Sequence, residues 1–547
     1  MKTKSFDSTY GYERKKNDYH QIMINHMIIL NTLKFLLIFG YLTTNLFTNV
    51  ALGQMKIEKY KFKVDLTKVE NDQLKIELHS PRINQSEVIY YIPQIVPGIY
   101  EKLEFGKYVS DFHAFTATGK ELKVEKVEKN GWKIYNAQRL FRITYKVDDG
   151  YESLGDSNKA RFRSAASNFT PNEVFIINHN CLFGYFEGMT KQPIELTFNK
   201  PKGFYGATSM NSTKRTSSQD VFLMRDYRSL IDAPLMYSKP DTTSLQVANA
   251  KIRVAVHSKT DKKYAKGVAK HLRSLLEAQK DYLGGVLPVD NYTFIINHGI
   301  WKSNNVVADA LEHSYSSLYL FSAADDDLEP IASIVKTIAS HEFFHIVTPL
   351  NIHSEEIENY DFNDPKMSQH LWLYEGMTEY ATMHMPVKQK IQDISAFFEV
   401  LKRKVTHSRK FNNALSFTQM SKNILKHGNQ YYNVYLKGAL IGMCLDIRLR
   451  ELSGGKYGTQ NLMRDLAKKY GKHTPFKDDE LIAEITKMTY PEIRQFFADY
   501  VINAKALPIK KYLLKTGIQY DEKDDNFSLL KNANPAQIAL RKAWLGF

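Results

Sequence analysis

The stretch His341-Glu342-Phe343-Phe344-His345 is the part of the sequence from which the fold can be argued. Residues four positions apart lie on one face of an α-helix, so the two histidines can bind a single metal ion there. The glutamate between them would then stand beside the ion as a base. The alternative interpretation is a surface helix with two solvated histidines, and the surrounding sequence decides between the two.

The flanking residues predict a helix whose apolar face carries both histidines. Aspartates at 325–327 place negative charge at its N-terminus, where the helix dipole favours it, Pro330 fits the first turn, and Pro349 limits the other end. At about 100° per residue, one face contains Ile331, Ile334, Val335, Ile338, His341, Glu342 and His345. The histidines therefore point inward, and a metal ion would give these buried polar groups the partners they need.

A catalytic Zn2+ usually has three protein ligands and one water molecule, so a third ligand is required. A histidine six residues after His345 would suit one known spacing, but Asn351 occupies that position and His353 does not fit it. Glu375, within the segment LWLYEGMTEY, is the stronger candidate, because this segment reads as a helix on which Glu375 and Glu379 share a face. The residues alone thus predict a zinc hydrolase that uses both histidines of the motif and Glu375 as ligands.

The composition is that of an ordinary globular protein. Of the 547 residues, 43 % are apolar and 24 % are charged, and at about 100–200 residues per domain we expect two to four domains. The formal net charge is +15, but the lysines are scattered and no nucleic-acid-binding motif is evident, so we expect no nucleic-acid partner. The cysteines, Cys181 and Cys444, exclude a disulfide framework; whether they pair is left open, and two buried thiols are favoured.

Residues 1–53 have the pattern of a secretory leader. A polar, basic start is followed by an apolar stretch from about Met27, and small residues at 51–53 suit a cleavage site. Translation from Met23 or Met27 is compatible with this pattern, and an uncleaved membrane anchor is the alternative, which Lys34 weakens by interrupting the apolar run. We therefore expect a secreted or periplasmic protein without a stable membrane partner unless the leader is retained.

The rest of the chain divides into a β-rich part and a helical part. Residues 56–245 contain short β-branched or aromatic runs between turn residues, which predicts a β-sandwich-like domain. The polar stretch SKPDTTS marks a boundary, after which residues 250–506 begin with strand and helix patterns and become mainly helical. Residues 507–547 are expected to form a C-terminal tail. The predicted fold class is multidomain α+β.

Together, HEFFH and LYEGMTEY resemble the motifs of the gluzincin peptidases, and within these the chain resembles the glycyl aminopeptidase family. The segment IPQIVPGIYEKLEFGKYVSDF resembles the N-terminal motif of that family, with Pro97, Gly98 and Tyr100 retained and Ile95 in place of its tryptophan. Further similar segments are DALEHSYS (309–316), YYNVYLKGALIGMCLD (431–446) and ALPIKKYLLKTGI (506–518). The resemblance covers roughly residues 56–520.

The resemblance implies a thermolysin-like, mainly helical zinc peptidase domain after the β domain, with one Zn2+ per chain on the ligands named above. It also implies that Glu342 is the base, that Glu312 binds the free amino group of a peptide substrate, and that Tyr435 stabilises the oxyanion. A carboxylate suits a buried ammonium, and a phenol suits a developing negative charge. The alternatives for Glu312 and Tyr435 are a solvent-exposed strand-edge glutamate and a core tyrosine.

Two departures from the family are visible. Asp309 and Ala310 replace a pair of glycines, which would let backbone and substrate approach closely. We therefore expect recognition of the substrate's first residue to differ, or the exopeptidase preference to be lost. Many relatives also carry a C-terminal PDZ domain, and the residues after 506 are too few to form one, so we expect none.

The sequence thus predicts a secreted zinc aminopeptidase that removes N-terminal residues from peptides or proteins, small residues such as glycine and alanine being suggested by the resemblance. Three alternatives stay open: a zinc endopeptidase with altered N-terminal recognition, a non-catalytic zinc-containing binding protein, and a surface polysaccharide- or nucleic-acid-binding β-protein. The preferred first residue, the natural substrate and the oligomeric state do not follow from the sequence.

Overall fold

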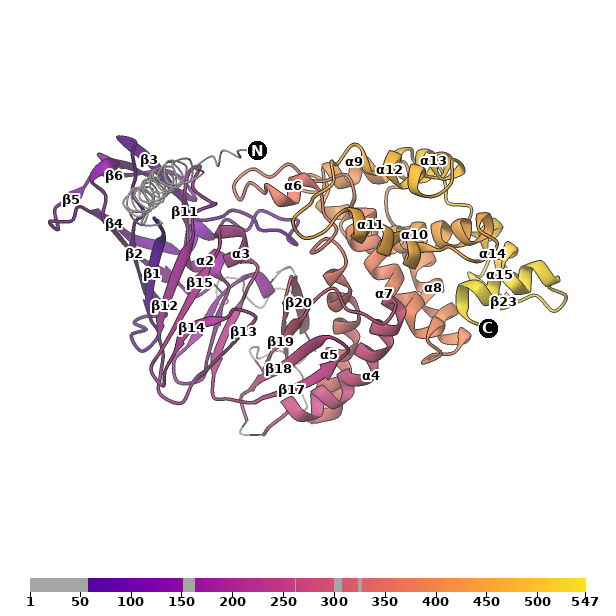
Figure 1. Cartoon of the computed structure of the whole chain (residues 1–547), viewed down its shortest axis with the longest axis horizontal. Helices are drawn as coiled ribbons and strands as arrows, with labels where there is room; N and C mark the ends of the chain where they lie inside the picture. Colours follow the sequence, from indigo (N-terminus) through magenta and orange to yellow (C-terminus); the bar gives the residue numbers. More distant parts are fainter. Residues whose placement is uncertain (1–57, 151–162, 261, 300–306, 323–326) are drawn as a thin grey trace, which may run out of the picture. The chain divides into compact units, whose positions relative to one another are not determined.

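The computed structural model describes residues 58–150, 163–260, 262–299, 307–322 and 327–547 (Figure 1). The predicted leader at 1–53 and two of the aspartates expected before the metal-site helix, Asp325 and Asp326, lie outside the described residues. Within the described ranges, none of the helices combines the length and the apolar character needed to cross a membrane.

Three β-sheets make up the described chain before residue 240. The largest has eight strands in the order β14 (Ser212–Arg215), β15 (Gln219–Met224), β12 (Ile194–Asn199), β1 (Tyr60–Asp65), β2 (Gln73–His79), β8 (Arg142–Asp148), β4 (Val109–Phe115) and β5 (Glu121–Leu122). One four-stranded sheet has the order β13 (Tyr205–Thr208), β16 (Leu235–Ser238), β10 (Val174–Ile177) and β9 (Asn168–Thr170). The other has the order β11 (Tyr185–Phe186), β3 (Glu87–Tyr91), β7 (Gly131–Tyr135) and β6 (Val124–Glu128). Two short helices accompany them, α2 (His179–Leu182) and α3 (Tyr227–Ile231).

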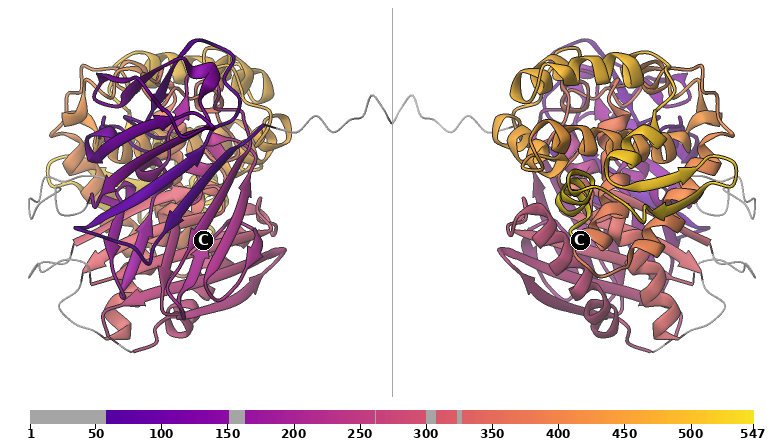
Figure 2. Two further views of the ribbon diagram at one scale, coloured as in Figure 1. Left: turned by 90° about the vertical axis from the view of Figure 1, so that its left-hand side faces the viewer. Right: turned by 90° about the vertical axis from the view of Figure 1, so that its right-hand side faces the viewer.

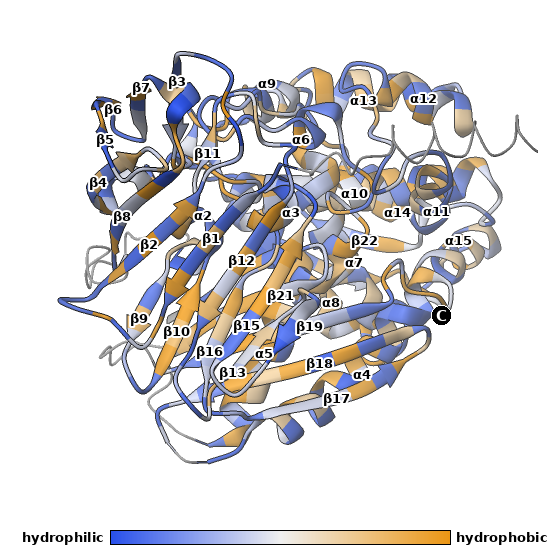
Figure 3. Ribbon diagram, turned by 60° about the vertical axis from the view of Figure 1, so that its left-hand side comes forward, coloured by the Kyte–Doolittle hydropathy of each residue, from blue (hydrophilic) through white to orange (hydrophobic). Residues whose placement is uncertain are grey.

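The strands of the large sheet alternate between buried apolar and exposed polar residues, as the banding along β1 and β2 shows (Figure 3). In β1, Tyr60, Phe62 and Val64 are buried and the lysines between them are exposed, which is the period of a strand with one covered face. The covered face meets the smaller sheets; the hydroxyl groups of Tyr90 on β3 and Tyr145 on β8, for example, lie 3.0 Å apart. This confirms the predicted β-sandwich-like arrangement.

A five-stranded sheet follows, in the order β17 (Thr242–Val247), β18 (Ala250–Ser258), β19 (Asn291–His298), β21 (Ser316–Ser322) and β20 (Val307–His313). Its three central strands are parallel, and β20 pairs antiparallel with β21 at the edge. One face packs against α4 (Ala265–Leu283) and α5 (Leu328–Glu342), and the other packs against the four-stranded sheet that contains β13. The predicted amine-binding residue, Glu312, therefore lies on an edge strand.

The remaining elements are mainly helices, which confirms the predicted α+β fold class (Figure 1). They are α6 (Glu355–Glu358), α7 (Met377–Lys388), α8 (Ile394–Ser408), α9 (Phe417–Lys422), α10 (Asn433–Leu452), α11 (Thr459–Lys469), α12 (Leu481–Met488), α13 (Glu492–Phe497), α14 (Ile509–Lys515), β22 (Ile518–Asp521), β23 (Asn526–Leu529) and α15 (Pro535–Leu545). The predicted domain boundaries themselves stay predictions.

Residues 507–547, expected to be a tail, form α14, the β22–β23 hairpin and α15, which lie over the other helices (Figure 2, right). Trp544 is fully buried. Its indole Nε1 donates a hydrogen bond of 2.8 Å to the Tyr380 hydroxyl on α7, and its carbonyl oxygen lies 2.9 Å from His384 Nε2. The C-terminal segment is therefore part of the core behind the helix that follows Glu375.

Candidate metal centre and its cleft

The three predicted ligands converge where α5 ends. His341 is in the last turn of α5 and His345 is in the 3₁₀ turn Phe343–Ile346 that follows, and their Nε2 atoms lie 3.1 Å apart. Glu375 Oε2 lies 3.4 Å from His341 Nε2 and 3.6 Å from His345 Nε2. Tetrahedral ligands at about 2.0–2.2 Å from Zn2+ are roughly 3.3–3.6 Å from one another. Both distances to Glu375 fall in this range and the distance between the two histidines is slightly shorter, so the three atoms are close to the spacing of a zinc site.

The chemistry of Glu375 also suits a cation. Its side chain is buried, and its Oε2 atom has no hydrogen-bond partner among the described residues, which is costly unless an ion binds there. Burial acts to raise the pKa of Glu375, but positive charge on the neighbouring His345 and His341 lowers it below its usual value. The group is therefore an ionised carboxylate beside two imidazoles, a donor set that zinc accepts.

Both ligand-bearing segments depart from the regular helices that the sequence predicts. α5 stops at Glu342, so His345 is reached through a tighter turn, which is common at helix ends. Glu375 lies in a π-helical turn, Trp372–Gly376, that leads into α7, and such single turns occur frequently at functional sites. A Cβ on Gly376 would stand 2.8 Å from Gly438 Cα, so the glycines allow α10 to pack directly against this turn.

Glu379 holds the first ligand in place. Its Oε2 accepts a hydrogen bond of 2.7 Å from His341 Nδ1, and its Oε1 accepts one of 2.5 Å from Lys404 Nζ. Burial acts to raise the pKa of Glu379, but the hydrogen bond with His341 and the charge on Lys404 lower it to about 2. Glu379 therefore stays ionised and fixes the proton of His341 on Nδ1, which leaves Nε2 free to bind a metal.

The other two ligands have similar supports. His345 Nδ1 lies 3.0 Å from the carbonyl oxygen of Thr348, which likewise directs its Nε2 toward the ligand group. The Tyr100 hydroxyl donates a hydrogen bond of 2.9 Å to Glu375 Oε1, so only Oε2 remains for an ion. Tyr100 belongs to the β-rich part of the chain, which therefore supplies one side of the metal centre.

Replacing Glu379 by glutamine is expected to weaken zinc affinity by about 10–100-fold, because the amide no longer offers a charged acceptor to His341. Equilibrium titration with a fluorescent zinc chelator measures this. Glu480→Gln is the matched control, since the Glu480 side chain is 57 % exposed and, among the residues that the structure describes, pairs with Lys477 alone. Equal affinities of the two variants would show that Glu379 does not support the metal.

Glu342 and Glu312 lie next to the ligands. One ligand atom each of Glu312, Glu342 and His345 all lie within 4.8 Å of one another, but a group with a single histidine suits zinc less well than the group described above. Burial raises the pKa of Glu342 well above its usual value; His341 opposes this and Glu312 adds to it. Burial also raises the pKa of Glu312. Several carboxyl groups close together favour the binding of a cation, either a metal ion or an ammonium group.

A cleft of ≈ 730 Å³ surrounds these groups, and Tyr435 lines it from α10. The ring centroids of Tyr435 and His341 are 5.6 Å apart, and the Tyr435 hydroxyl lies 2.5 Å from that of Tyr431. Tyr435 is partly exposed to the cleft, and Glu312 is partly buried in it. Tyr435 is therefore not a core tyrosine, and Glu312 is not a fully solvent-exposed glutamate on a strand edge.

Asp309 and Ala310 bind a segment of the β-rich part. The backbone N–H of Ser164, in the 3₁₀ turn Arg163–Ala165, donates a hydrogen bond of 2.7 Å to Asp309 Oδ2. The Ser164 hydroxyl donates one of 3.1 Å to the carbonyl oxygen of Ala310. A glycine at position 309 would lack the carboxylate that accepts the first of these bonds, whereas the second goes to a backbone carbonyl that any residue offers.

Sequence reasoning assigned no site role to Glu379, Tyr100 or Tyr431. Glu379 carried a signal, because it was expected on the same helix face as Glu375. Tyr100 belongs to a segment singled out by resemblance, but nothing in that segment tells what it contacts. The roles proposed for Glu342, Glu312 and Tyr435 stay predictions, now with a common location.

Two sequence models of one family match the chain: Peptidase M61 N-terminal domain at residues 61–239 and M61 glycyl aminopeptidase at residues 335–441. Among curated proteins none matches the chain. Among solved structures, the chain resembles an aminopeptidase N family protein from Idiomarina loihiensis with 21 % identity and a TM-score of 0.73, over 87 % of this chain and 82 % of that one. It also resembles an M1 zinc metallopeptidase mutant from Deinococcus radiodurans, bound to a Tyr-Ser-Ala substrate, with 12 % identity and a TM-score of 0.51, over 83 % and 95 % of the chains. At these identities the structures show a shared fold.

Proposed function

The chain belongs to the M61 glycyl aminopeptidase family, and from this premise we propose that its cleft removes the first residue from peptides with a free amino terminus, using one Zn2+. The observation that carries the proposal is the convergence of His341, His345 and Glu375 with two further carboxylates in one cleft. A site that only binds a metal needs no more than the two histidines and Glu375. The two further carboxylates, Glu342 and Glu312, supply a base and an anion that can pair with an ammonium group.

Zinc on the three ligands would act as a Lewis acid, polarising the scissile carbonyl group and lowering the pKa of a water molecule towards about 7. Glu342 accepts a proton from the attacking water and delivers it to the leaving amine. Tyr435 donates its hydroxyl proton in a hydrogen bond to the carbonyl oxygen as negative charge develops there. Burial and the nearby charge of Glu375 raise the pKa of Tyr435 well above its usual value, so the hydroxyl stays a donor.

Glu312 binds the free amino group of the substrate. Its carboxylate lies at most 4.8 Å from ligand atoms of Glu342 and His345, so an amino group bound at Glu312 brings the carbonyl group of the same residue to the metal and the base. A buried carboxylate with a raised pKa is stabilised in its charged form by an ammonium partner. Cutting would therefore be restricted to the first peptide bond.

A pair of pentapeptides that differ only in a free or acetylated amino terminus tests this function. We expect the free peptide to be cut at its first bond about 10²–10³-fold more efficiently, because acetylation leaves the buried Glu312 without its partner. A chelator should stop the reaction and added zinc should restore it. In Glu312→Gln the advantage of the free peptide should shrink.

Two results would contradict the aminopeptidase. Equal cleavage of both peptides would identify an endopeptidase with altered N-terminal recognition. Binding of one zinc per chain without cleavage of either peptide would identify a non-catalytic zinc protein.

A further inference from the structure

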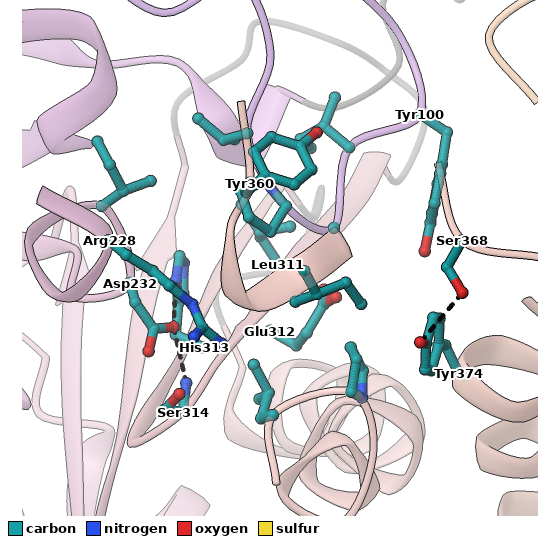
Figure 4. Close-up of a pocket in the computed structure, with 18 of the residues that line it drawn as sticks. Tyr100, Arg228, Asp232, Leu311, Glu312, His313, Ser314, Tyr360, Ser368 and Tyr374 are labelled. Atoms are coloured by element: carbon teal, nitrogen blue, oxygen red, sulfur yellow. Dashed lines mark hydrogen bonds and ion pairs between the residues drawn. The ribbon is translucent and has the colours of Figure 1, made fainter. Parts of the chain in front are cut away.

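A second cavity, the side pocket, adjoins the metal cleft at Glu312 (Figure 4). Its volume is ≈ 80 Å³, and Gly98, Leu311 and Glu312 line both cavities. The other walls are mainly apolar and include Val96, Ile231, Leu350, Ile357, Met367 and Leu371. A peptide whose first residue is glycine would leave this apolar space unfilled.

Gly98 makes the junction between the two cavities possible. Its φ is +84°, in the left-handed region that favours glycine. A Cβ at this position would stand 2.8 Å from Glu312 Oε1 and 3.1 Å from Leu311 Cδ1. Any larger residue would therefore displace the carboxylate that is proposed to hold the amino group.

The two cavities lie along β20 on either side of Glu312. The metal cleft is lined by the preceding residues, 308–310, and the side pocket by the following residues, His313 and Ser314. A peptide held by its amino group at Glu312 extends into the metal cleft. The side chain of its first residue is attached to the carbon that carries this amino group, so it is positioned to enter the side pocket.

We propose that the side pocket binds the side chain of the substrate's first residue and that the enzyme prefers an aliphatic first residue, such as leucine or methionine, to glycine. This inference rests on the proposed aminopeptidase function and specifies its substrate. It also replaces the expectation of a preference for glycine and alanine. The driving force is transfer of apolar side-chain surface from water into an apolar cavity.

The size of the side pocket limits the side chain. A cavity of about 150 Å³ is known to hold a benzene molecule. At ≈ 80 Å³ the side pocket is about half as large, which suits a branched or linear aliphatic chain rather than an aromatic ring. Phenylalanine and tryptophan should therefore be poorer first residues than leucine.

A charged side chain on the substrate's first residue would gain little binding energy at the polar end of the side pocket, where the protein's charged groups are already paired (Figure 4). Asp232 Oδ1 accepts a hydrogen bond of 2.9 Å from the Ser314 backbone N–H and lies 3.6 Å from His313 Nδ1. Arg228 pairs with Glu358. Neither a basic nor an acidic first residue would find an opposite charge left over there.

The test is a panel of aminoacyl coumarin amides with glycine, alanine, leucine, methionine, phenylalanine and lysine, hydrolysed by the full chain loaded with zinc. We expect kcat/KM for leucine and methionine to exceed that for glycine by at least about 10–200-fold, the range that a single buried methylene group gives in an apolar pocket. Glycine equal to or better than leucine would overturn the preference and leave the aminopeptidase standing. Hydrolysis of none of the amides would overturn both.

Ile357→Trp narrows the side pocket from its wall, and Ile391→Trp is the matched control, because Ile391 is 49 % exposed and does not line either cavity. The leucine-to-glycine ratio of kcat/KM should fall at least about tenfold in Ile357→Trp and stay unchanged in Ile391→Trp. An unchanged ratio in a folded Ile357→Trp, checked by its thermal melting curve, would overturn the assignment of the side pocket. Ile357→Phe makes the same test with a smaller volume change, should the tryptophan variant not fold.

Discussion

Replacing Glu342 by glutamine is expected to lower kcat by about 10²–10⁴-fold, while the protein keeps one Zn2+ per chain. A carboxylate oxygen of Glu342 lies within 4.8 Å of ligand atoms of Glu312 and His345, but Glu342 is not one of the three residues predicted to bind the metal. Glutamine has the same shape and cannot accept the proton of the attacking water. In this variant turnover should therefore fall while the zinc content stays unchanged.

Turnover of a leucyl amide and zinc content by mass spectrometry measure the two quantities on one preparation. Glu480→Gln, at an exposed surface position, should match the unchanged protein in both. Activity of Glu342→Gln near that of the unchanged protein would remove Glu342 from the mechanism. Loss of zinc in the same variant would mean that Glu342 is a ligand after all.

Replacing Glu375 by alanine is expected to abolish stable zinc binding and, with it, hydrolysis. Glu375 contributes the one carboxylate of the ligand group, and its buried Oε2 has no hydrogen-bond partner among the described residues. Two imidazoles alone leave zinc one protein ligand short of the usual catalytic set. The loss of affinity should exceed the roughly 10–100-fold expected when a supporting residue such as Glu379 is changed.

Zinc per chain after dialysis against a weak chelator is the measurement. Less than about a tenth of the stoichiometric amount is expected for Glu375→Ala, against full occupancy for Glu480→Gln. A thermal melting curve without metal tells loss of the ligand from loss of the fold, because it should change little between the variants. Full zinc occupancy in a folded Glu375→Ala would show that the metal lies elsewhere.

Much of the fold and the metal centre could be predicted from local sequence. The alternation in β1 and the helical period before His341 are properties of single elements, and both are present in the structure. The histidines four positions apart also need only one helix end to come together. The irregular turns were not predicted; the π-helical turn at Glu375, for example, packs through Gly376 against a helix much later in the chain, a contact that the local sequence does not record.

The predicted leader lies outside the described residues, so location outside the cytoplasm stays a prediction. Asp309 and Ala310, which replace the family's two glycines, both contact Ser164. The Asp309 carboxylate accepts a hydrogen bond from the Ser164 backbone N–H, so the aspartate ties β20 to the β-rich part rather than adding a free charge to the cleft.

The sequence by itself predicted the ligand types and the base and determined the alternation of strands and helices, because residue chemistry and spacing within one element are enough for these. Only the tertiary structure decided what surrounds them. Tyr100 is 275 residues from Glu375, to which it donates a hydrogen bond, and Glu379 meets His341 from another helix. The side pocket is likewise formed by residues from distant segments. No local period records such contacts, since the packing of separate elements sets the distances between them.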